Sequence, residues 1–306
     1  MMPQMIPFAE CDSLLDWQDL GAALEAGHRL PRAEISDSIL RRGRDTLLSR
    51  AAWIDGLGIA VKSATVFPGN AAAGAPTVNG GVALYSDATG MLEAVLDFHL
   101  VTRWKTAADS LLAARRLARP DSRRILIVGA GTVARSLREA YGSLFPDAAF
   151  SVWSRTEASA RALAADHPDT AVAPDLEAAV RAADIITCAT MATEPLILGS
   201  WLRPGQHVDL IGAYRPDMRE ADDAALSRAR LFVDSRDTTL EHIGELIEPL
   251  RTGAISRDDV LADFYDIASG RFRRTCDAEI TLFKNGGGAH LDLMTSRYIL
   301  DVWESR

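Results

Sequence analysis

Residues 124–134 read Arg-Ile-Leu-Ile-Val-Gly-Ala-Gly-Thr-Val-Ala, and the fold follows from this stretch. The run Arg124–Val128 is typical of a short buried strand in a parallel sheet, and the glycine-rich turn after it opens a helix. Gly129, Gly131 and Ala134 give the spacing GxGxxA of a turn that binds a dinucleotide. Such a turn needs one glycine for its sharp bend, a second for close approach of a pyrophosphate, and a small third residue for helix packing. The alternative is a glycine-rich turn in another kind of α/β sheet.

Strand and helix patterns alternate through the residues that follow this turn. Strands are predicted over 149–153, 170–173, 185–189, 208–211 and 231–233, and helices over 133–144, 157–166 and 176–182. This alternation is typical of a doubly wound parallel sheet, in which ligands bind at the carboxyl ends of the strands. We therefore predict a Rossmann-type α/β domain over residues 120–284 that binds a nicotinamide dinucleotide.

The end of the second predicted strand bears on which dinucleotide is bound. An NAD site usually has an Asp or Glu there, about 20 residues after the glycines, to hold the ribose 2′-hydroxyl. Trp153, Ser154, Arg155 and Thr156 occupy this place, and none of them is an acid. The Arg155 guanidinium and its two hydroxyl neighbours suit a 2′-phosphate instead. We expect NADPH, with NADH as the alternative cofactor and a solvated loop arginine as the other reading of Arg155.

Further cofactor contacts are expected at the start of the first helix and at the carboxyl ends of later strands. They are Thr132, Val133, Cys188, Ala189, Thr190 and Gly212. Cys188 is expected to be a small buried packing residue rather than a nucleophile, because no His and acid accompany it at a recognisable spacing.

The first part of the chain has a different pattern of predicted strands and helices. Strand-like stretches separated by turns predict a mostly antiparallel sheet, and helical patterns flank it. The strands are predicted over 46–53, 58–67, 80–85 and 91–96, and the helices over 13–26, 107–118 and 290–303. We predict an α+β domain over residues 1–119, with a boundary near 119–122, that the C-terminal segment 285–306 completes.

Four cations in this first domain are candidates for binding a substrate. Lys62 interrupts an apolar strand, although an outward edge lysine would also explain it. Lys105 is placed at the start of the helix predicted over 107–118, where a cation is unfavourable and invites a functional explanation. Arg103 competes for that role, and Arg32 is a further candidate anion binder.

Composition excludes several classes of protein. The chain has 306 residues and a net charge of −9, which argues against a nucleic-acid partner because phosphate binding requires clustered cations. Its three cysteines form no CxxC pair, so neither a disulfide framework nor a metal site is expected. The segment Met1–Asp16 lacks the pattern of a signal peptide, and no apolar run approaches the roughly 20 residues of a membrane helix. We expect a cytoplasmic protein with no membrane partner.

Together these motifs resemble the ornithine cyclodeaminase/mu-crystallin family over nearly the whole chain. The matching segments are 60–70, 87–90, 102–108, 127–131, 183–190, 211–212, 218–220, 233–236, 244–245 and 280–284. The resemblance implies a homodimer in which the first domain provides dimerisation and substrate binding. It also implies an NAD(P) domain and a substrate that is an α-amino or α-imino acid.

The resemblance also assigns roles to single residues. It places Lys62 beside the substrate, and it places Lys105 and Arg32 where the family binds the substrate carboxylate. We expect Lys62 to make a second contact to that carboxylate or to supply the proton to the imine nitrogen. Thr106 is expected to add a hydroxyl hydrogen bond, and Lys284 to lie at the cofactor.

The chain departs from the cyclodeaminases in three places. Lys105 stands where they have Arg, which keeps the charge but loses the bidentate fork. Tyr214 stands where they have the acid that activates a water or an amine. The closing loop reads Phe283-Lys-Asn-Gly-Gly287 in place of Phe-Lys-Ser-x-Gly.

The segment Trp104–Ser110 instead resembles the ketimine reductases that act on Δ1-pyrroline-2-carboxylate in trans-3-hydroxyproline breakdown. We therefore expect NAD(P)H-dependent reduction of a cyclic ketimine acid to an L-imino acid, such as L-proline or, for the larger ring, L-pipecolate. The alternatives are an ornithine cyclodeaminase, an oxidoreductase similar to alanine dehydrogenase, and a non-catalytic protein that binds NADPH and a small ligand.

Overall fold

The computed structural model describes residues 2–306, which form two compact units. The first unit comprises the chain up to Lys105 together with Gly288–Arg306, and the second comprises Thr106–Gly287. The sequence places this boundary near residue 119, but it falls inside helix α3 (Phe98–Leu117), because that helix is continuous and serves both units. The C-terminal helix belongs to the first unit.

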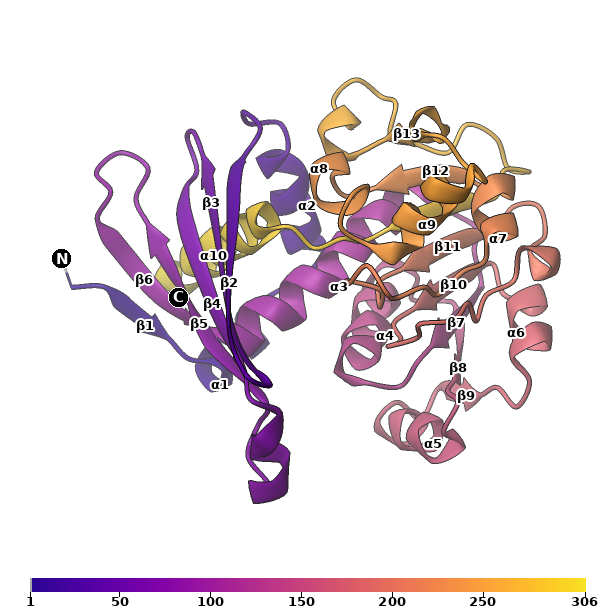
Figure 1. The fold of residues 1–306 in the computed structure, drawn as a ribbon, viewed down its shortest axis with the longest axis horizontal. Helices are drawn as coiled ribbons and strands as arrows, with labels where there is room; N and C mark the ends of the chain where they lie inside the picture. The colour runs from indigo at the N-terminus through magenta and orange to yellow at the C-terminus, as the bar shows by residue number, and fades with distance from the viewer. Residues whose placement is uncertain (1) are drawn as a thin grey trace. The chain divides into compact units, whose positions relative to one another are not determined.

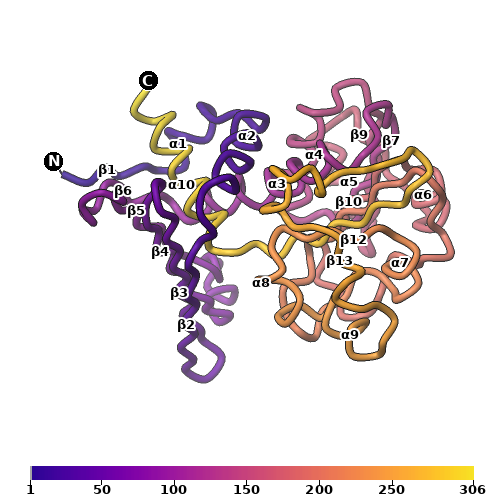
Figure 2. The backbone as a smooth tube through the Cα atoms, turned by 90° about the horizontal axis from the view of Figure 1, so that it is seen from above, coloured from indigo at the N-terminus to yellow at the C-terminus, as the bar shows by residue number. Residues whose placement is uncertain are grey.

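The first unit is built on a six-stranded sheet in the order β1-β6-β5-β4-β3-β2 (Figure 2). Neighbouring strands are antiparallel except β1 and β6, which are parallel. The strands are β1 (Gln4–Ile6), β2 (Glu34–Arg42), β3 (Asp45–Ile54), β4 (Gly58–Val66), β5 (Val78–Tyr85) and β6 (Leu92–Asp97). The predicted antiparallel sheet is confirmed, whereas β1 and β2 were not predicted, because β1 is very short and β2 is an exposed edge strand without apolar alternation.

Several helices and short turns accompany this sheet in the first unit. They are α1 (Phe8–Cys11), α2 (Trp17–Gly27), the first turns of α3, and α10 (Ala289–Glu304), with short 3-10 turns at Asp12–Leu14 and Pro68–Ala73. The single helix predicted over 13–26 is divided, because the Asp16 carboxylate accepts hydrogen bonds from the backbone of Gln18 and Asp19 and caps a new helix there. Helix α10 packs against β3, β4 and α2.

The second unit contains an eight-stranded sheet in the order β13-β12-β14-β11-β10-β7-β8-β9, and all of its strand pairs are parallel (Figure 1). The strands are β7 (Arg124–Val128), β8 (Ala149–Trp153), β9 (Thr170–Val172), β10 (Ile185–Cys188), β11 (His207–Leu210), β12 (Arg230–Val233), β13 (Val260–Ala262) and β14 (Thr281–Lys284). The Rossmann-type sheet is confirmed. Strands β13 and β14 were not predicted, and β14 lies between β11 and β12.

Helices pack against this sheet and connect its strands. They are α4 (Thr132–Leu144), α5 (Glu157–Asp166), α6 (Leu176–Ala182), α7 (Asp223–Arg228), α8 (Arg236–Thr239) and α9 (Gly244–Thr252), with 3-10 turns at Gly199–Trp201, Arg257–Asp259 and Phe264–Asp266. Strands β8 and β9 continue on one side of β7, and β10 and β11 on the other. The order therefore reverses between β7 and β10, and ligands of such sheets bind at the carboxyl ends beside this reversal.

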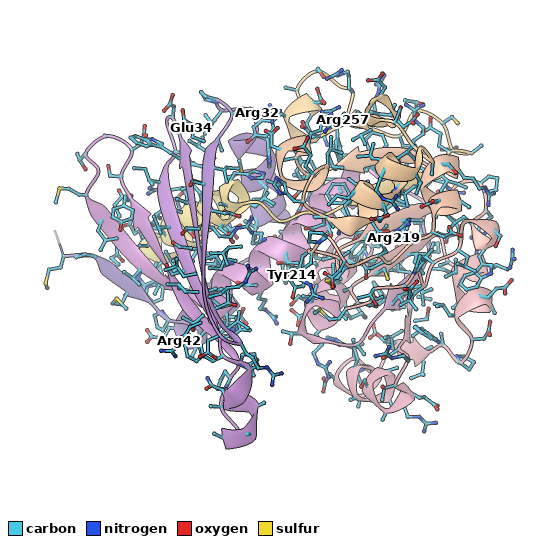
Figure 3. The ribbon with its side chains drawn as sticks, in the orientation of Figure 1. Arg32, Glu34, Arg42, Tyr214, Arg219 and Arg257 are labelled. Atoms are coloured by element: carbon cyan, nitrogen blue, oxygen red, sulfur yellow. The ribbon has the colours of Figure 1, made fainter. Side chains whose placement is uncertain are left out.

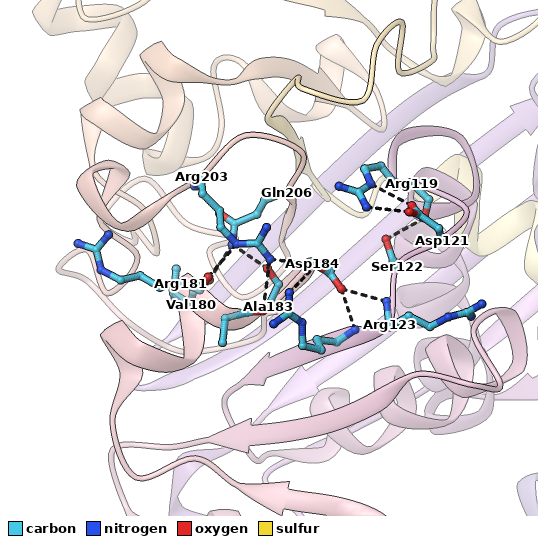
Figure 4. Close-up of polar contacts among 12 residues, drawn as sticks. Arg119, Asp121, Ser122, Arg123, Val180, Arg181, Ala183, Asp184, Arg203 and Gln206 are labelled. Carbon is cyan, nitrogen blue, oxygen red and sulfur yellow. Dashed lines mark hydrogen bonds and ion pairs between the residues drawn. The ribbon is translucent and has the colours of Figure 1, made fainter.

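The amino ends of β7 and β10 are tied together by one carboxylate (Figure 4). Asp184 accepts hydrogen bonds from the backbone of Arg123 and Arg124, and its other oxygen pairs with the Arg203 side chain. Burial opposes ionisation of Asp184, but these donors hold its pKa at about 2. This network fixes the two strands at the end of the sheet opposite their carboxyl ends.

Within residues 2–306, no helix is both long enough and apolar enough to cross a bilayer. The same residues contain no cluster of three His, Cys, Asp or Glu side chains arranged to hold a metal ion.

Candidate functional site

The glycine-rich turn lies where the carboxyl ends of β7, β8 and β10 meet. Gly129 has φ +107°, which favours glycine, and a Cβ built on it would lie 2.5 Å from the carbonyl oxygen of Ala189. Its N–H donates to the carbonyl of Trp153 at 2.8 Å. Gly129 thus lets the ends of three neighbouring strands approach closely.

Gly131 leaves open space at the start of helix α4. It is exposed, and a Cβ built on it would meet no atom within 4 Å. It is also the N-cap residue of the 13-residue helix α4 and offers no side-chain acceptor, so the helix N-terminus stays available to an anion. Thr132 is exposed and Val133 is half-buried beside it. This cradle fits the pyrophosphate of a dinucleotide.

The predicted ribose-binding residues follow β8 directly. Trp153 and Ser154 are half-buried, whereas Arg155 and Thr156 are exposed. Thr156 is the N-cap residue of α5, and its side chain makes no capping hydrogen bond. The Arg155 guanidinium is therefore accessible to a phosphate group at the end of this strand.

A buried glutamate shapes the turns after β10 and β11. The Glu220 carboxylate accepts hydrogen bonds from the backbone N–H of Thr190 at 2.7 Å and of Gly212 at 2.6 Å, and from the Thr190 hydroxyl at 2.8 Å. The Glu245 carboxylate in turn accepts from the backbone N–H of Glu220 at 2.8 Å. Burial, and then the charge of Glu220, raises the pKa of Glu245 to about 7. No role was predicted for either glutamate, although both lie in segments that match the family.

Cys188 and Lys284 are both fully buried at this edge of the sheet. Burial, and then the charge of Glu220, raises the pKa of the Cys188 thiol, so it packs in the core as expected and does not act as a thiolate. The Lys284 ammonium is turned inward and donates to the carbonyls of Leu210 at 2.9 Å and Asn285 at 2.8 Å. Lys284 therefore fixes the ends of β11 and β14 from within the unit.

Asn285 extends this arrangement to helix α3. Its side-chain amide donates to the carbonyl of Thr106 and to the hydroxyl of Ser110, each at 3.1 Å. Ser110 donates onward to the buried carboxylate of Asp209 at 3.0 Å. The backbone of the half-buried Thr106 is thereby held at a fixed place in the second unit.

The first unit holds Lys62 and Lys105, which are both 7% exposed. The Lys62 ammonium donates to the Asp292 carboxylate at 2.9 Å and lies 4.8 Å from the centre of the Phe98 ring. Arg50 lies directly opposite Lys62 in the antiparallel pair of β3 and β4, so their side chains share one face of the sheet. Lys62 is therefore an inward residue and not an outward edge lysine.

Lys105 does not lie at the start of a helix, as the sequence suggested. It is the eighth residue of α3, which begins at Phe98 because the Asp97 carboxylate caps it by accepting from the backbone of His99 and Leu100. The argument from the helix dipole therefore does not apply to Lys105. What marks Lys105 is the burial of its charge.

Positive charges gather around His290 at the start of α10. Burial lowers the pKa of this imidazole well below its usual value, and surrounding groups lower the pKa further. These groups are His28, Lys105, Arg50 and Arg32. Arg32 is exposed in the segment that leads into β2, near Glu34 (Figure 3). Lys62, Lys105, Arg50 and Arg32 thus form a cation cluster, whose charge is of the sign that attracts a carboxylate.

Arg103 is paired elsewhere, and three residues near Lys62 and Lys105 were not predicted. Arg103, which competed with Lys105, pairs with Asp12 at 3.1 Å. Arg50, His290 and Asp292 were not predicted as site residues. The register of β3 and β4 places Arg50, and the packing of α10 places the other two, and neither is visible in a local motif.

Comparison with known proteins decides the family. The sequence model of the ornithine cyclodeaminase/mu-crystallin family matches residues 51–306. The chain belongs to this family. A Δ1-pyrroline-2-carboxylate reductase of Paracoccus denitrificans is 53% identical over 306 residues, which cover 98% of this chain and 97% of the relative. The resemblance seen in the sequence is confirmed.

Two solved structures share the fold of this chain. The Thermococcus litoralis Δ1-pyrroline-2-carboxylate reductase, solved with NADH and L-proline, is 25% identical with a TM-score of 0.91 and covers 99% of this chain and 98% of its own. An archaeal alanine dehydrogenase dimer with bound NAD is 27% identical, also with a TM-score of 0.91, and covers 100% of this chain and 97% of its own. The fold therefore does not separate these two activities.

Proposed function

We propose that this chain is an NAD(P)H-dependent oxidoreductase that reduces the cyclic ketimine acid Δ1-pyrroline-2-carboxylate to L-proline. The observation that carries the proposal is the 53% identity, over 98% of the chain, to a reductase of that name. The cation cluster of the first unit and the dinucleotide turn of the second would supply the two binding functions that such a reaction needs.

The second unit holds the cofactor in this proposal. Gly131 and the N-terminus of α4 would bind the pyrophosphate, and Arg155 with Ser154 and Thr156 would bind a ribose 2′-phosphate, which favours NADPH over NADH. The bound cofactor supplies a hydride to the carbon of the C=N bond. Glu220 keeps the turns at Thr190 and Gly212 in place for it.

The first unit holds the substrate. Lys105 and Arg32 would anchor the carboxylate and fix the orientation of the ring, while Thr106 is a further candidate hydrogen-bond donor. Lys62 would donate a proton to the imine nitrogen, which makes the neighbouring carbon electrophilic. The ammonium suits this task because, unlike a guanidinium, it releases a proton readily.

The direct test follows NAD(P)H absorbance at 340 nm with purified protein and Δ1-pyrroline-2-carboxylate. We expect oxidation that is faster with NADPH than with NADH. Faster oxidation with NADH would keep the reaction and remove the role of Arg155. A parallel assay with Δ1-piperidine-2-carboxylate tests whether the site also accepts the six-membered ring and yields L-pipecolate.

An alanine dehydrogenase activity is the second candidate, because an alanine dehydrogenase matches the whole fold with the same TM-score of 0.91 as the reductase. Oxidation of the cofactor that requires pyruvate and ammonia would support it. Cyclodeamination is disfavoured by Tyr214, an exposed residue where the cyclodeaminases have an acid (Figure 3). Ammonia release from ornithine without net cofactor turnover would reverse that judgement.

The proposal also includes a homodimer in the cytoplasm. On the sheet face opposite α10, Leu40, Leu47 and Trp53 are 64%, 37% and 49% exposed, and an apolar face of this kind is typical of a surface that a partner covers. Its three cysteines are free, which fits a reducing compartment. Sedimentation of the wild type and of Leu40→Glu tests the dimer, and a monomeric wild type would contradict it.

A further inference from the structure

Asp292 is a buried carboxylate that the reaction outlined above does not use. It is 1% exposed and lies in the first turn of α10, where the helix N-terminus favours a negative charge. Its Oδ1 accepts the hydrogen bond from Lys62 at 2.9 Å, across 230 positions of the sequence. Its Oδ2 is also buried and makes no hydrogen bond within residues 2–306. One oxygen of the carboxylate thus accepts a hydrogen bond from Lys62, and the other is able to accept a further one.

The groups that face Lys62 come from three elements. Strand β3 contributes Arg50, helix α3 contributes Lys105 and the Phe98 ring, and helix α10 contributes Asp292. The bond to Asp292 is the only hydrogen bond that the Lys62 ammonium makes to residues 2–306. Because an ammonium has three N–H donors, donors remain for a ligand.

The composition of the chain indicates why this position holds a lysine. Of its 33 lysine and arginine residues, only Lys62, Lys105 and Lys284 are lysines, and all three are buried. An arginine could pair with Asp292, but its guanidinium does not give up a proton in proteins. A lysine at position 62, in a chain whose other cationic side chains are arginines except at Lys105 and Lys284, is therefore consistent with a need for a transferable proton.

We propose that Asp292 is a positioning residue that keeps Lys62 charged between turnovers and directs one of its N–H groups at the imine nitrogen. This role rests on the proposed function. In the step, an N–H bond of Lys62 breaks and an N–H bond forms on the imine nitrogen, while the hydride from the cofactor forms the new C–H bond. Lys62 is left as a neutral amine next to Asp292, and a proton from water restores its charge.

Electrostatics around the pair agree with this geometry. Burial lowers the pKa of Lys62 to about 8, and the charge of Asp292 opposes this decrease whereas Lys105 and Arg50 add to it. Burial raises the pKa of Asp292, but the three cations outweigh burial and hold that pKa below its usual value. Asp292 therefore stays a carboxylate at neutral pH. Without it, Lys62 would face a ring and two cations, and would lose its proton at a lower pH.

The test compares Asp292→Asn and Asp292→Glu with the wild type, and Asp301→Asn serves as the control on an exposed position of the same helix. Protein labelled with 13C at the lysine ε-carbon gives three lysine signals, and Lys62→Arg identifies that of Lys62. Its titration by NMR and the pH profile of kcat/KM are measured together. NADPH titration and circular dichroism report whether each variant is folded.

We expect Asp292→Asn to move the Lys62 titration and the alkaline limb of kcat/KM downward together by at least about one pH unit. For a shift of one unit this is a loss of about fivefold at pH 8, with a smaller loss at pH 6.5. Asp292→Glu should keep the alkaline limb of kcat/KM near that of the wild type but lower kcat, because the longer side chain displaces the ammonium. If Asp292→Asn does not fold, the comparison of Asp292→Glu with the wild type tests the proposal. Asp301→Asn behaves as the wild type.

Two results would overturn the role of Asp292: an unchanged Lys62 titration in Asp292→Asn, or an equal loss of kcat/KM at every pH. The wild type is assayed first. A wild type that oxidises no NAD(P)H with the pyrroline acid overturns the proposed function itself, whereas an active wild type with the same pH profile as Asp292→Asn overturns only this inference.

Discussion

Single residues carry the proposed chemistry of the first unit, and Lys62 is the most sharply defined. A positioned general acid typically contributes between about 100-fold and 10,000-fold to the rate. We expect Lys62→Ala to lower kcat/KM by at least about 100-fold, and Lys62→Arg not to restore it, because a guanidinium keeps the charge but not the proton transfer. Steady-state kinetics check this result.

Lys105→Arg is the matched control for that prediction. It keeps a charge at another buried position of the same cluster and adds a bidentate donor for a carboxylate, so its loss should be smaller than that of Lys62→Ala. Equal activity of Lys62→Ala and the wild type would rule out proton donation by Lys62.

In our proposal, Arg155 determines the choice of cofactor in the second unit. Because its guanidinium is exposed at the end of β8, Arg155→Ala removes the proposed partner of the 2′-phosphate without disturbing the core. We expect the KM for NADPH to rise about tenfold, since a charge-assisted hydrogen bond contributes about 1.5–3 kcal/mol. The KM for NADH should not change. A parallel rise in both constants would show that Arg155 does not read the 2′-phosphate.

In the turn between β7 and α4, one glycine is needed for cofactor binding and another for the stability of the fold. Gly131→Ala places a methyl group where no atom lies within 4 Å, so the fold should tolerate it. The same methyl group occupies the proposed pyrophosphate cradle, and we expect the Kd for NADPH to rise at least about tenfold, or about 1.4 kcal/mol. Fluorescence titration and thermal melting measure the two effects separately.

Gly129→Ala is the contrasting variant in the same turn. At φ +107°, and with the Ala189 carbonyl 2.5 Å from the added carbon, it should destabilise the protein by about 1–3 kcal/mol. If Gly131→Ala lost stability as Gly129→Ala does, or bound NADPH normally, the assignment of the cradle would be wrong.

Local sequence patterns predicted most helices and strands of both units, but they did not predict which strands pair with one another in the sheets. The strands β7, β8, β10 and β11 follow from short apolar runs, because burial on both faces selects such runs. The place of β14 between β11 and β12 does not, since pairing with strands distant in the chain leaves no local mark. The start of α3 could have been predicted, because Asp97 is a typical N-cap residue.

In the candidate site, too, contacts between residues distant in the sequence could not be predicted from local patterns. Lys62 was found because a charge inside an apolar strand is a local signal. Asp292 contacts it across 230 positions, and Arg50 faces it through strand register, so neither contact can be read from spacing. The resemblance to the family assigned residues of the ligand sites, but not the carboxylates, such as Glu220, that hold those sites in shape.

For the molecule as a whole, buried titratable groups give opposite dependences of stability on pH. Burial lowers the pKa of His28 to about 4 and of His207 to about 3, both below the 6.5 of an unperturbed imidazole. The folded state then binds fewer protons than the unfolded state below pH 6.5, so these residues make stability fall as the pH falls toward 4. Glu245 acts in the other direction, because its folded pKa of about 7 lies above the ordinary 4.5.

Glu245→Gln isolates the second effect. Between pH 4.5 and 7 the folded wild type holds more protons than the unfolded chain, so Glu245 makes the free energy of unfolding fall as the pH rises, by about 3 kcal/mol in total. Glutamine mimics the neutral acid at every pH. We expect Glu245→Gln to match the wild type at pH 4.5 and to exceed its stability at pH 8.5, measured by urea unfolding.

The control for this prediction lies on the same helix. Arg251 lowers the pKa of Glu248 through a side-chain hydrogen bond, so Glu248→Gln should not become more stabilising as the pH rises. If Glu245→Gln were equally destabilising at pH 4.5 and 8.5, its bonds to the backbone of Glu220 and Ala221 would outweigh the cost of burying its charge. A gain that grows between pH 4.5 and 7 and then stays constant would instead show that the carboxylate supporting the turns after β10 and β11 is retained at a cost in stability.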